Sequence, residues 1–458
     1  MAGREPVASP PDTRSIARRL AVLAGPVIGV NVLNVLALAV DTAMVGRTDM
    51  ADTALTGLGF ATQVIFLLMV AMLGLTVGTV AFVARAHGAG HDEKVDHILA
   101  QSSQLTLIMG LVVAVVGNLA APWILSGLGA SDAARDAGLL YLRPLLACST
   151  FYYLNILYAA VLRGVGNTRL AFGVALVMNL LNVVFNYGLI LGNYGLPAMG
   201  IAGAAWGTAI AQMCSVALYV VLLKRGVSGI TLSLRPRPID IPLAKDLIRV
   251  GSPAALDMLV LNAGFLSIVG MLGRFDEVAV AAHGIGLRIQ ALAFVPGMSI
   301  SQATGAMVGN ALGANDLKQA KAVARASMAM CFTVMVTLCL VIVAVSVPTV
   351  QLFDVDPTSP LGGYTITWIK LLAACMPPVG IYIALVGVFQ GSGATRLSLR
   401  INILATLAQI PISWLLGFPL GLGAWGIWAG FPVAFVIKAI MGAIEYRRGS
   451  WAKIGARA

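Results

Sequence analysis

The chain has 458 residues, of which 59% are hydrophobic and only 11% are charged. Soluble domains carry roughly 25% charged residues, so this composition excludes an ordinary soluble protein and indicates one that crosses a membrane repeatedly. The net charge of +11 would suit a nucleic-acid partner, but basic loops retained on the cytoplasmic side of a membrane protein explain it more simply. We therefore predict no nucleic-acid partner.

Continuous apolar stretches follow one another along the chain, and each is long enough for a bilayer-spanning helix, which needs about 20 residues. The strands of a membrane barrel would instead alternate apolar and polar positions. We therefore predict an all-α polytopic membrane protein. Its twelve helices should be centred near residues 33, 70, 109, 149, 180, 211, 259, 295, 334, 378, 408 and 433.

The distribution of Lys and Arg predicts the orientation of the chain. With the N-terminus inside, 24 of the 30 basic residues fall in the tails and loops of the cytoplasmic side, Arg85 and Lys438 among them. Both termini are therefore expected to be cytoplasmic. Arg143 and Lys370, which lie near the outer ends of their spans, are interpreted as anchors at the membrane interface.

Asp41 stands inside the first apolar run. A carboxylate at the centre of a membrane costs about 3 kcal/mol on insertion scales, and such residues usually mark a proton or ion pathway. Asn34 precedes Asp41 by seven positions, so the two share one face of the helix. This polar stripe must face protein or water rather than lipid. We predict that Asp41 is an ion-coupling residue.

The sequence repeats itself after 227 positions. Each half holds six spans, and because this number is even, both halves should have the same orientation as a parallel repeat. The matched segments are Gly164–Arg169 with Gly391–Arg396, Met44–Arg47 with Met271–Arg274, and Pro26 with Pro253. The predicted domains are a disordered cytoplasmic tail (1–15), an N-terminal lobe (16–224), a cytoplasmic linker (225–245), a C-terminal lobe (246–446) and a second cytoplasmic tail (447–458).

These features resemble the multidrug and toxic compound extrusion (MATE) family, and the prokaryotic DinF-like branch is the most similar. The resemblance runs from about residue 16 to 446. It is carried by Val40–Arg47, Gly164–Arg169, Gly200–Trp206, Ala281–Gln290 and Gly423–Trp428. It implies a secondary antiporter of the bacterial inner (plasma) membrane that exports amphiphilic or cationic organic compounds in exchange for H⁺ or Na⁺ by alternating access.

The same resemblance implies no cofactor other than the coupling ion. We expect a monomer whose partners are small-molecule amphiphilic substrates and membrane lipids. One departure concerns the fifth span, where many relatives carry an acid at the position of Asn186. Here Asn179, Asn182 and Asn186 share one helix face instead. Asparagine can hydrogen-bond Asp41 in either protonation state but cannot carry the proton.

The predicted ion-coupling site therefore comprises Asp41, Asn34, Asn182 and Asn186. Asp257, in the seventh span, is a candidate site of the C-terminal lobe, either as an acid lining its cavity or as a residue facing water at the inner mouth. The candidates for a substrate cavity are Asn179, Tyr153, Gln63 and Arg288. For Arg288 we favour a structural role as a paired or snorkelling cation.

Other classes of protein are less consistent with the sequence. The segment with His87, His91 and His97 is expected to be a solvated loop, and no metal site is predicted. Sequence motifs for ATP use or hydrolysis are absent, so the chain is not expected to be an enzyme. A lipid-linked precursor flippase of related architecture would need more cations within the membrane. A non-transporting scaffold would gain nothing from a buried acid.

Overall fold

The computed structural model describes residues 13–46, 51–233, 238–352 and 355–455, and this part of the chain contains helices and no strand. Eleven of its helices are long and apolar enough to cross a membrane, and two shorter helices joined at a 58° bend make a twelfth span. The predicted fold class is confirmed. Each predicted centre falls in one of these spans, and the fourth, residue 149, lies at the bend.

The first half of the chain contains the first six spans. The helices α3, η1 and α4 run on as one span, and α5 and α6 form the bent pair. The elements are α1 (Thr13–Val45), α2 (Ala51–Gly88), α3 (Asp92–Val112), the π-helical turn η1 (Val113–Gly117), α4 (Asn118–Gly127), α5 (Asp132–Ala147), α6 (Ser149–Gly164), α7 (Thr168–Leu191) and α8 (Ile201–Lys224).

The second half repeats this order. Moved by 227 positions, α1 falls on α9, α2 on α10 and α7 on α14, while the bent pair α5–α6 falls on the single helix α13. The elements are the 3-10 turn η2 (Val227–Gly229), α9 (Ile241–Phe275), α10 (Glu277–Gly313), α11 (Leu317–Ala344), α12 (Ser346–Leu352), α13 (Pro360–Gly391), α14 (Thr395–Gly417), α15 (Gly423–Arg448) and α16 (Ser450–Gly455).

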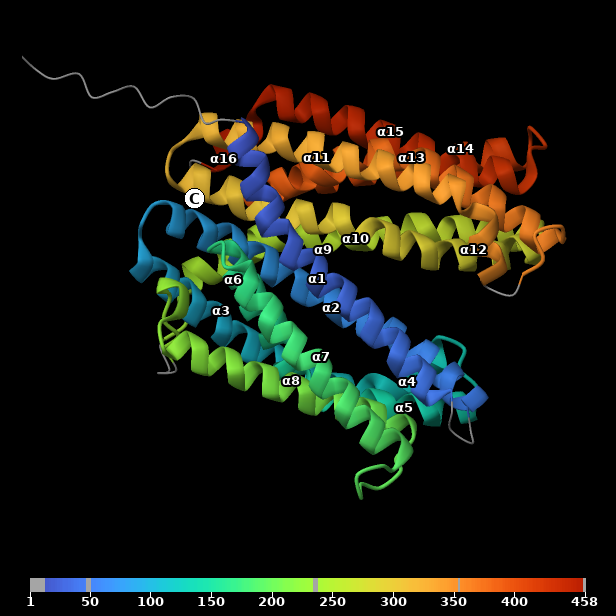
Figure 1. Cartoon of the computed structure of the whole chain (residues 1–458), viewed down its shortest axis with the longest axis horizontal. Coiled ribbons are helices and arrows are strands. Elements are labelled where there is room, and N and C mark those ends of the chain that lie inside the picture. The colour runs from blue at the N-terminus through green and yellow to red at the C-terminus, as the bar shows by residue number, and fades with distance from the viewer. Residues whose placement is uncertain (1–12, 47–50, 234–237, 353–354, 456–458) are drawn as a thin grey trace, which may run out of the picture.

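The two halves form two groups of helices that meet at one end and diverge toward the other (Figure 1). We call the meeting end, where the C-terminus lies, the terminal end. The first helix of each half is shared between the groups. Helix α1 packs against α7 and also against α10 and α11, and its repeat mate α9 packs against α14 and also against α2 and α3. Any movement of α1 against α7 therefore also affects the contact between the halves.

The beginning of α1 belongs to the hydrophobic core of the second half. Its residues Ile16, Leu20 and Ala24 are buried in that core. Farther along α1, the amide of Asn31 donates a hydrogen bond of 2.9 Å to the hydroxyl of Ser299 on α10. The predicted tail up to residue 12 and the motif residue Arg47 lie outside the described residues.

At the terminal end, two hydrogen bonds related by the repeat join the halves. The guanidinium of Arg85 on α2 donates to the backbone carbonyl of Ser392, which follows α13. The amide of Asn310 on α10 donates to the carbonyl of Gly164, at the end of α6, at 3.2 Å. The sequence predicts Arg85 in a loop, but it is buried in the last turn of α2. That prediction is wrong because the helix continues past the apolar run.

The backbones of α2 and α10 touch beside these hydrogen bonds. A Cβ atom at Gly88 would overlap the carbonyl oxygen of Asn310, and one at Gly313 would overlap that of Arg85. The two contacts are equivalent, because Gly88 and Gly313, like Arg85 and Asn310, are 225 positions apart. We call these four residues the terminal clasp. It closes the terminal end of the molecule in this structure.

The segment between the halves is attached to α3. Asp240 caps α9 by accepting the backbone N–H of Leu243 at 3.0 Å, and its second carboxylate oxygen lies 3.0 Å from Nε2 of His97. The Leu243 N–H, and then His97, hold the pKa of the Asp240 carboxyl below its usual range. The loop predicted for His97 is wrong, since this residue lies on α3. The described residues contain no cluster of three potential metal ligands.

Candidate functional site

Asp41 lies near the end of α1 and is hydrogen-bonded by α7. The Nδ2 atom of Asn186 donates to Oδ1 of Asp41 at 2.6 Å. The side chain of Asn186 is fully buried and that of Asp41 is partly buried. Among the described residues, no Lys, Arg or His forms an ion pair with Asp41. The structure thus holds an acid without a cation against an amide that can donate or accept.

The other asparagines of the predicted ion-coupling site, and the cavity candidate Asn179, do not contact Asp41. Asn182 donates to the hydroxyl of Thr208 on α8 at 3.0 Å, and Asn179 donates to a carbonyl of its own helix at 2.8 Å. Asn34 is exposed and makes no hydrogen bond with a described residue. Of the three predicted partners of Asp41, which are Asn34, Asn182 and Asn186, only Asn186 is therefore hydrogen-bonded to it within the described chain.

Tyr141 on α5 is a neighbour of Asp41 that the sequence does not predict. It is buried and interacts electrostatically with Asp41 and with Tyr152 on α6. A phenol can donate a hydrogen bond to a carboxylate and accept one from a carboxylic acid. The only signal in the sequence is that Tyr141 matches Trp368 at the repeat offset, which indicates a structural position rather than a polar one.

Gly207 on α8 keeps the amide of Asn186 in place. A Cβ atom at Gly207 would overlap Oδ1 of Asn186 and would lie 3.1 Å from its backbone nitrogen. Gly207→Ala is expected to move Asn186 away from Asp41. The export rate that the family resemblance implies should then fall by at least about tenfold, because small displacements of functional groups are costly. The export rate per folded protein in vesicles checks this.

The matched control for this substitution is Gly173→Ala. Gly173 lies on α7, and a Cβ atom there would meet nothing within 4 Å. This variant should export at the rate of the unaltered protein. Equal rates for the two alanine variants would show that the contact between Gly207 and Asn186 does not affect transport.

The second half contains a similar pair at a different height. Asn402 on α14 donates to Oδ1 of Asp257 on α9 at 2.7 Å. In both halves the asparagine follows its aspartate by 145 residues. Asp257, however, precedes Ile268, the repeat mate of Asp41, by eleven residues. At 1.5 Å per residue, the second pair lies about 16 Å nearer the terminal end. Asp257 is only 8% exposed, so it does not face water at a mouth.

Lys438 on α15 is a buried cation of the second half. It is 1% exposed and forms no ion pair within 4.0 Å with a described residue. Its ammonium nitrogen lies 4.6 Å from the ring centroid of Phe435 and 5.9 Å from that of Tyr382. The sequence places Lys438 among the cytoplasmic loops, and this prediction is wrong, because α15 continues for ten residues beyond it, to Arg448.

The remaining cavity candidates are scattered. Tyr153 is buried in the core of the first half, where its hydroxyl donates to the carbonyl of Leu68 at 3.1 Å. It is therefore a core residue rather than a cavity residue. Gln63 on α2 and Arg288 on α10 are exposed and make no hydrogen bond or ion pair with the described residues. The structure brings none of these three to Asp41.

A buried polar cluster between α6 and α8 is also not predicted from the sequence. Asn155 donates to the side-chain oxygen of Gln212, and Ser215 donates to Asn155 at 3.3 Å. Gln212 and Ser215 are three residues apart on α8 and so share one helix face. Packing of α6 against α8 brings Asn155 to them, and the sequence does not show this.

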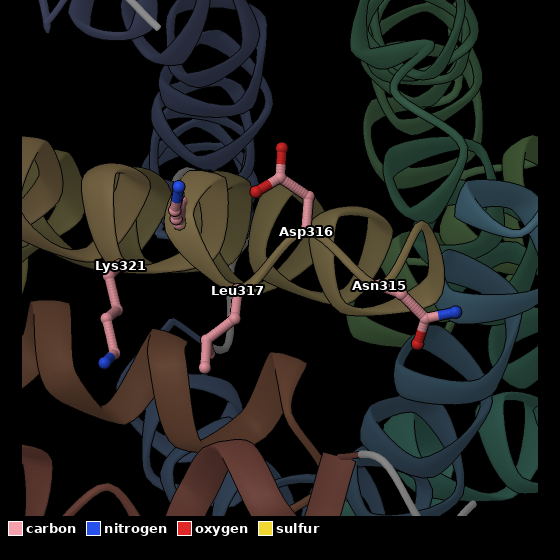
Figure 2. A pocket seen from close by; sticks show the side chains of 5 residues that line it. Asn315, Asp316, Leu317 and Lys321 are labelled. Atoms are coloured by element: carbon pink, nitrogen blue, oxygen red, sulfur yellow. The ribbon is translucent and has the colours of Figure 1, made fainter. Parts of the chain in front are cut away.

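A surface hollow of about 460 Å³ lies at the turn between α10 and α11 (Figure 2). It is lined by Asn315, Asp316, Leu317, Lys318 and Lys321. Asp316 caps α11 by accepting the backbone N–H of Gln319 at 2.8 Å, so its presence is explained by helix capping. None of the candidate residues lines this hollow. The candidate site is therefore the contact of Asp41 with Asn186, and not this hollow.

Known proteins share both the sequence and the repeat. A family model described as MatE matches residues 26–188 and again residues 253–415, and the second match begins and ends 227 positions after the first. The probable multidrug resistance protein NorM of Thermotoga maritima is 26% identical over 440 residues, which cover 96% of this chain and 94% of the relative. The probable multidrug resistance protein YoeA of Bacillus subtilis is 23% identical over 431 residues, which cover 93% and 92%.

Solved structures share the fold. A crystal structure of MATE in the bent conformation has a TM-score of 0.87 at 22% identity and covers 97% of this chain and 99% of its own. The outward-facing conformation of a multidrug resistance MATE family transporter also has a TM-score of 0.87, at 23% identity, and covers 96% of each chain. The resemblance predicted from the sequence motifs is thereby confirmed. The chain belongs to the MatE family, a family of multidrug efflux transporters rather than enzymes.

Proposed function

We propose that this chain is a secondary antiporter that exports amphiphilic or cationic organic compounds in exchange for protons, with Asp41 as the coupling residue. The observation that carries the proposal is the contact of Asp41 with the buried amide of Asn186. The proposal places the protein as a monomer among the lipids of a bacterial plasma membrane, with the terminal end and both termini on the cytoplasmic side. No cofactor is needed beyond the proton.

The amide of Asn186 offers a partner for both states of Asp41. Its Nδ2 donates to the carboxylate, while its Oδ1 is buried and has no hydrogen-bond partner among the described residues. A protonated carboxyl group gains an O–H donor, for which this free oxygen is an acceptor. Protonation would therefore exchange one hydrogen bond for another and shift α1 against α7. Because α1 also packs against α10 and α11, the shift reaches the contact between the halves.

Proton coupling is favoured over Na⁺ coupling by the same contact. The group 2.6 Å from the Asp41 carboxylate is an N–H donor, whose positive end repels a metal ion. Na⁺ would need several oxygen ligands, and the amide oxygen of Asn186 would supply only one beside the carboxylate. A proton needs only the carboxylate and the acceptor oxygen of the amide.

We propose alternating access because the two halves are joined at one end of the molecule and diverge at the other. The terminal clasp joins the halves at the terminal end, while their helices diverge at the other end (Figure 1). With the terminal end in the cytoplasm, this arrangement corresponds to an outward-facing state. Opening of the clasp, with the two lobes rotating relative to each other, would give the inward-facing state.

Vesicles containing the purified protein test the proposal when pH and Na⁺ gradients are imposed separately. Transport of an organic cation is expected to follow the pH gradient at equal Na⁺ and to be absent with a Na⁺ gradient at equal pH. Transport driven by Na⁺ alone would overturn proton coupling. Transport that responds to neither gradient would overturn the antiport mechanism.

Asn186→Asp is expected to change the pH dependence of transport more than the affinity for substrate. It places a second carboxyl group against Asp41, and two acids this close exchange protons as a coupled pair. The pH profile of the export rate should gain a second step, with the substrate KM altered less than the profile. Asn193→Asp, beyond the end of α7, is the control. An unchanged pH profile in a well-expressed Asn186→Asp variant would show that the contact between residues 41 and 186 has no role in transport.

A further inference from the structure

The segment that joins the two halves is held on the first half by polar side chains of α3. The side-chain oxygen of Gln101 accepts the backbone N–H of Asp240 at 3.0 Å, and its amide nitrogen donates to the carbonyl of Pro238 at 3.0 Å. Nearer the start of α3, Asp96 accepts the backbone N–H of Thr231 at 2.7 Å. These hydrogen bonds fix the chain on α3 directly before α9 begins.

His97 adds an ion pair to this attachment. Its Nε2 lies 3.0 Å from Oδ2 of Asp240, and the two side chains are 37% and 35% exposed. The other ion pairs recorded among the described residues join positions only one or three apart. Because Oδ1 of Asp240 caps α9 at Leu243, one carboxylate ties the first helix of the second half to α3 of the first half. We call the pair of His97 and Asp240 the α3 latch.

The second half is built without such a latch. Moved by 225 positions, α3 falls on α11 and His97 falls on Ala322. The start of α1 is held instead by apolar burial, because Ile16 is 2% exposed within the core of the second half. Its repeat mate Leu243, at the start of α9, is only partly buried. The scaffold therefore does not require an ion pair here, and the α3 latch needs another explanation.

The charge of the latch is set by His97. The backbone N–H of Leu243, and then His97, hold the pKa of the Asp240 carboxyl below its usual range, so Asp240 stays ionised near neutral pH. Arg235 and Arg237 of the linker lie outside the described residues. The other titratable groups of α3, of the start of α9 and of the helices packed on them form no ion pair within 4.0 Å with either member. They are Arg85, His87, Glu93, Lys94, Asp96, Arg163, Lys245, Asp246 and Arg396.

Protonation of His97 favours the closed latch. Histidine side chains change their charge between about pH 5 and 8. A protonated imidazole attracts the Asp240 carboxylate, whereas a neutral one keeps only a hydrogen bond. A proton that binds more tightly to the closed latch must by linkage stabilise that state. Acid therefore favours the closed latch, and rising pH favours its release. The terminal clasp is close by, since α2, which carries two of its residues, packs against both α3 and α9.

We propose that the α3 latch is a proton-sensing site on the cytoplasmic face, which holds the start of α9 on α3 and keeps the terminal end closed when the cytoplasm becomes acidic. The inference rests on the proposed antiport function and on the orientation given with it. Each export cycle brings protons into the cell. A protonated His97 slows the cycle as these protons accumulate, but it carries none of them across the membrane.

Spin labels beside the terminal clasp test the latch without transport. Ala89 and Ala314 are exposed repeat mates that directly follow the clasp glycines Gly88 and Gly313. Cysteines at positions 89 and 314, in a background in which the five natural cysteines are replaced, carry nitroxide labels on the purified full chain in lipid nanodiscs. Double electron–electron resonance then measures the share of molecules in which the two labels have moved apart. This open share is compared between variants at each pH.

His97→Gln and Asp240→Asn remove one charge each, and Asn still caps α9. At about pH 5.5 each variant should show an open share about threefold above that of the unaltered protein, a modest change because exposed ion pairs are weak. At about pH 8 the open shares should agree, since the latch of the unaltered protein is then neutral at His97. The double variant should exceed neither single variant, because both remove the same interaction.

The matched control is His91→Gln. His91 is exposed, directly precedes α3 and makes no side-chain hydrogen bond to the helix end. It should behave as the unaltered protein at every pH. Open shares of His97→Gln that equal those of the unaltered protein throughout would overturn the inference. An effect of His91→Gln as large as that of His97→Gln would do the same.

Export in inside-out membrane vesicles, whose cytoplasmic side faces the medium, provides the second readout. The ratio of the His97→Gln rate to the unaltered rate cancels the driving force, and it should rise from about one at pH 8 to about three at pH 5.5. His97→Arg, which keeps its charge, should export more slowly than the unaltered protein at pH 8. An equal ratio at both pH values would overturn the regulatory role. The label distances need no gradient, so a failure of the antiport proposal stays distinguishable from a failure of this one.

Discussion

Asp41→Asn is expected to abolish gradient-driven export while leaving folded protein in the membrane. The amide is nearly the same size as the carboxyl group and can still hydrogen-bond Asn186, whose Nδ2 lies 2.6 Å from Asp41. It cannot, however, take up or release a proton. The contact of α1 with α7 would then be fixed in one state. Export driven by a pH gradient should fall to the background of empty vesicles, whereas substrate binding at equilibrium should persist.

Asp246→Asn is the matched control for this substitution. Asp246 lies at the start of α9, is exposed, and forms only an i,i+3 ion pair of 3.7 Å with Arg249. Its export rate should equal that of the unaltered protein. Full export by Asp41→Asn, at equal amounts of folded protein, would show that coupling does not depend on this acid.

The spans and the repeat are predictable from the sequence because they follow from long continuous patterns. Every apolar run of about 20 residues forms a helix, and each helix of the first half has a mate 227 positions later. The bend at Cys148, between α5 and α6, is not predictable in this way. The corresponding helix α13 passes the same point as one helix, although the apolar pattern is continuous in both.

The contact between Asp41 and Asn186 is anticipated because both residues are polar within apolar helices. Asn34 shows the limit of such reasoning. It shares a helix face with Asp41, but α1 is 33 residues long and packs against different helices along its length. Residues on one face of a long helix therefore need not share one partner, and Asn34 is exposed.

The pair Asp257–Asn402 is hidden from a search for repeats. Its members are 145 residues apart, as are Asp41 and Asn186, but the pair is moved by eleven residues along both helices. A comparison at a fixed offset of 227 positions aligns Asp41 with Ile268 and misses the correspondence. Spacing within each half would have revealed it.

The positions of Arg85 and Lys438 show why the sequence alone does not separate loop cations from buried ones. The positive-inside rule sorts cations by their distance from apolar runs. Arg85 and Lys438 lie near the ends of such runs, but their helices continue past them to Gly88 and Arg448. Both side chains are buried, and each meets a group that is distant in the sequence: Arg85 the carbonyl of Ser392, and Lys438 the ring of Tyr382. Only packing of the folded chain separates a loop cation from a buried one.

Cysteines at positions 74 and 255 are expected to form a disulfide that arrests transport. Gly74 lies on α2 and Ala255 on α9, in opposite halves. A Cβ atom at Gly74 would lie 3.3 Å from the Cβ of Ala255, close to the separation of about 3.8 Å in disulfides. If the opening of the terminal end carries α2 away from α9, this contact must open with it. The crosslink would hold the protein in the state seen here.

The experiment uses a background in which the five natural cysteines, Cys148, Cys214, Cys331, Cys339 and Cys375, are replaced. The double variant Gly74→Cys/Ala255→Cys should crosslink on mild oxidation and lose export. Reduction should restore the rate to that of the two single variants, which separates the effect of the bond from that of the substitutions. A crosslink that forms in full yield and leaves export unchanged would show that α2 and α9 stay together throughout the cycle. In that event, the opening of the terminal end would have to occur elsewhere than at the contact between these two helices.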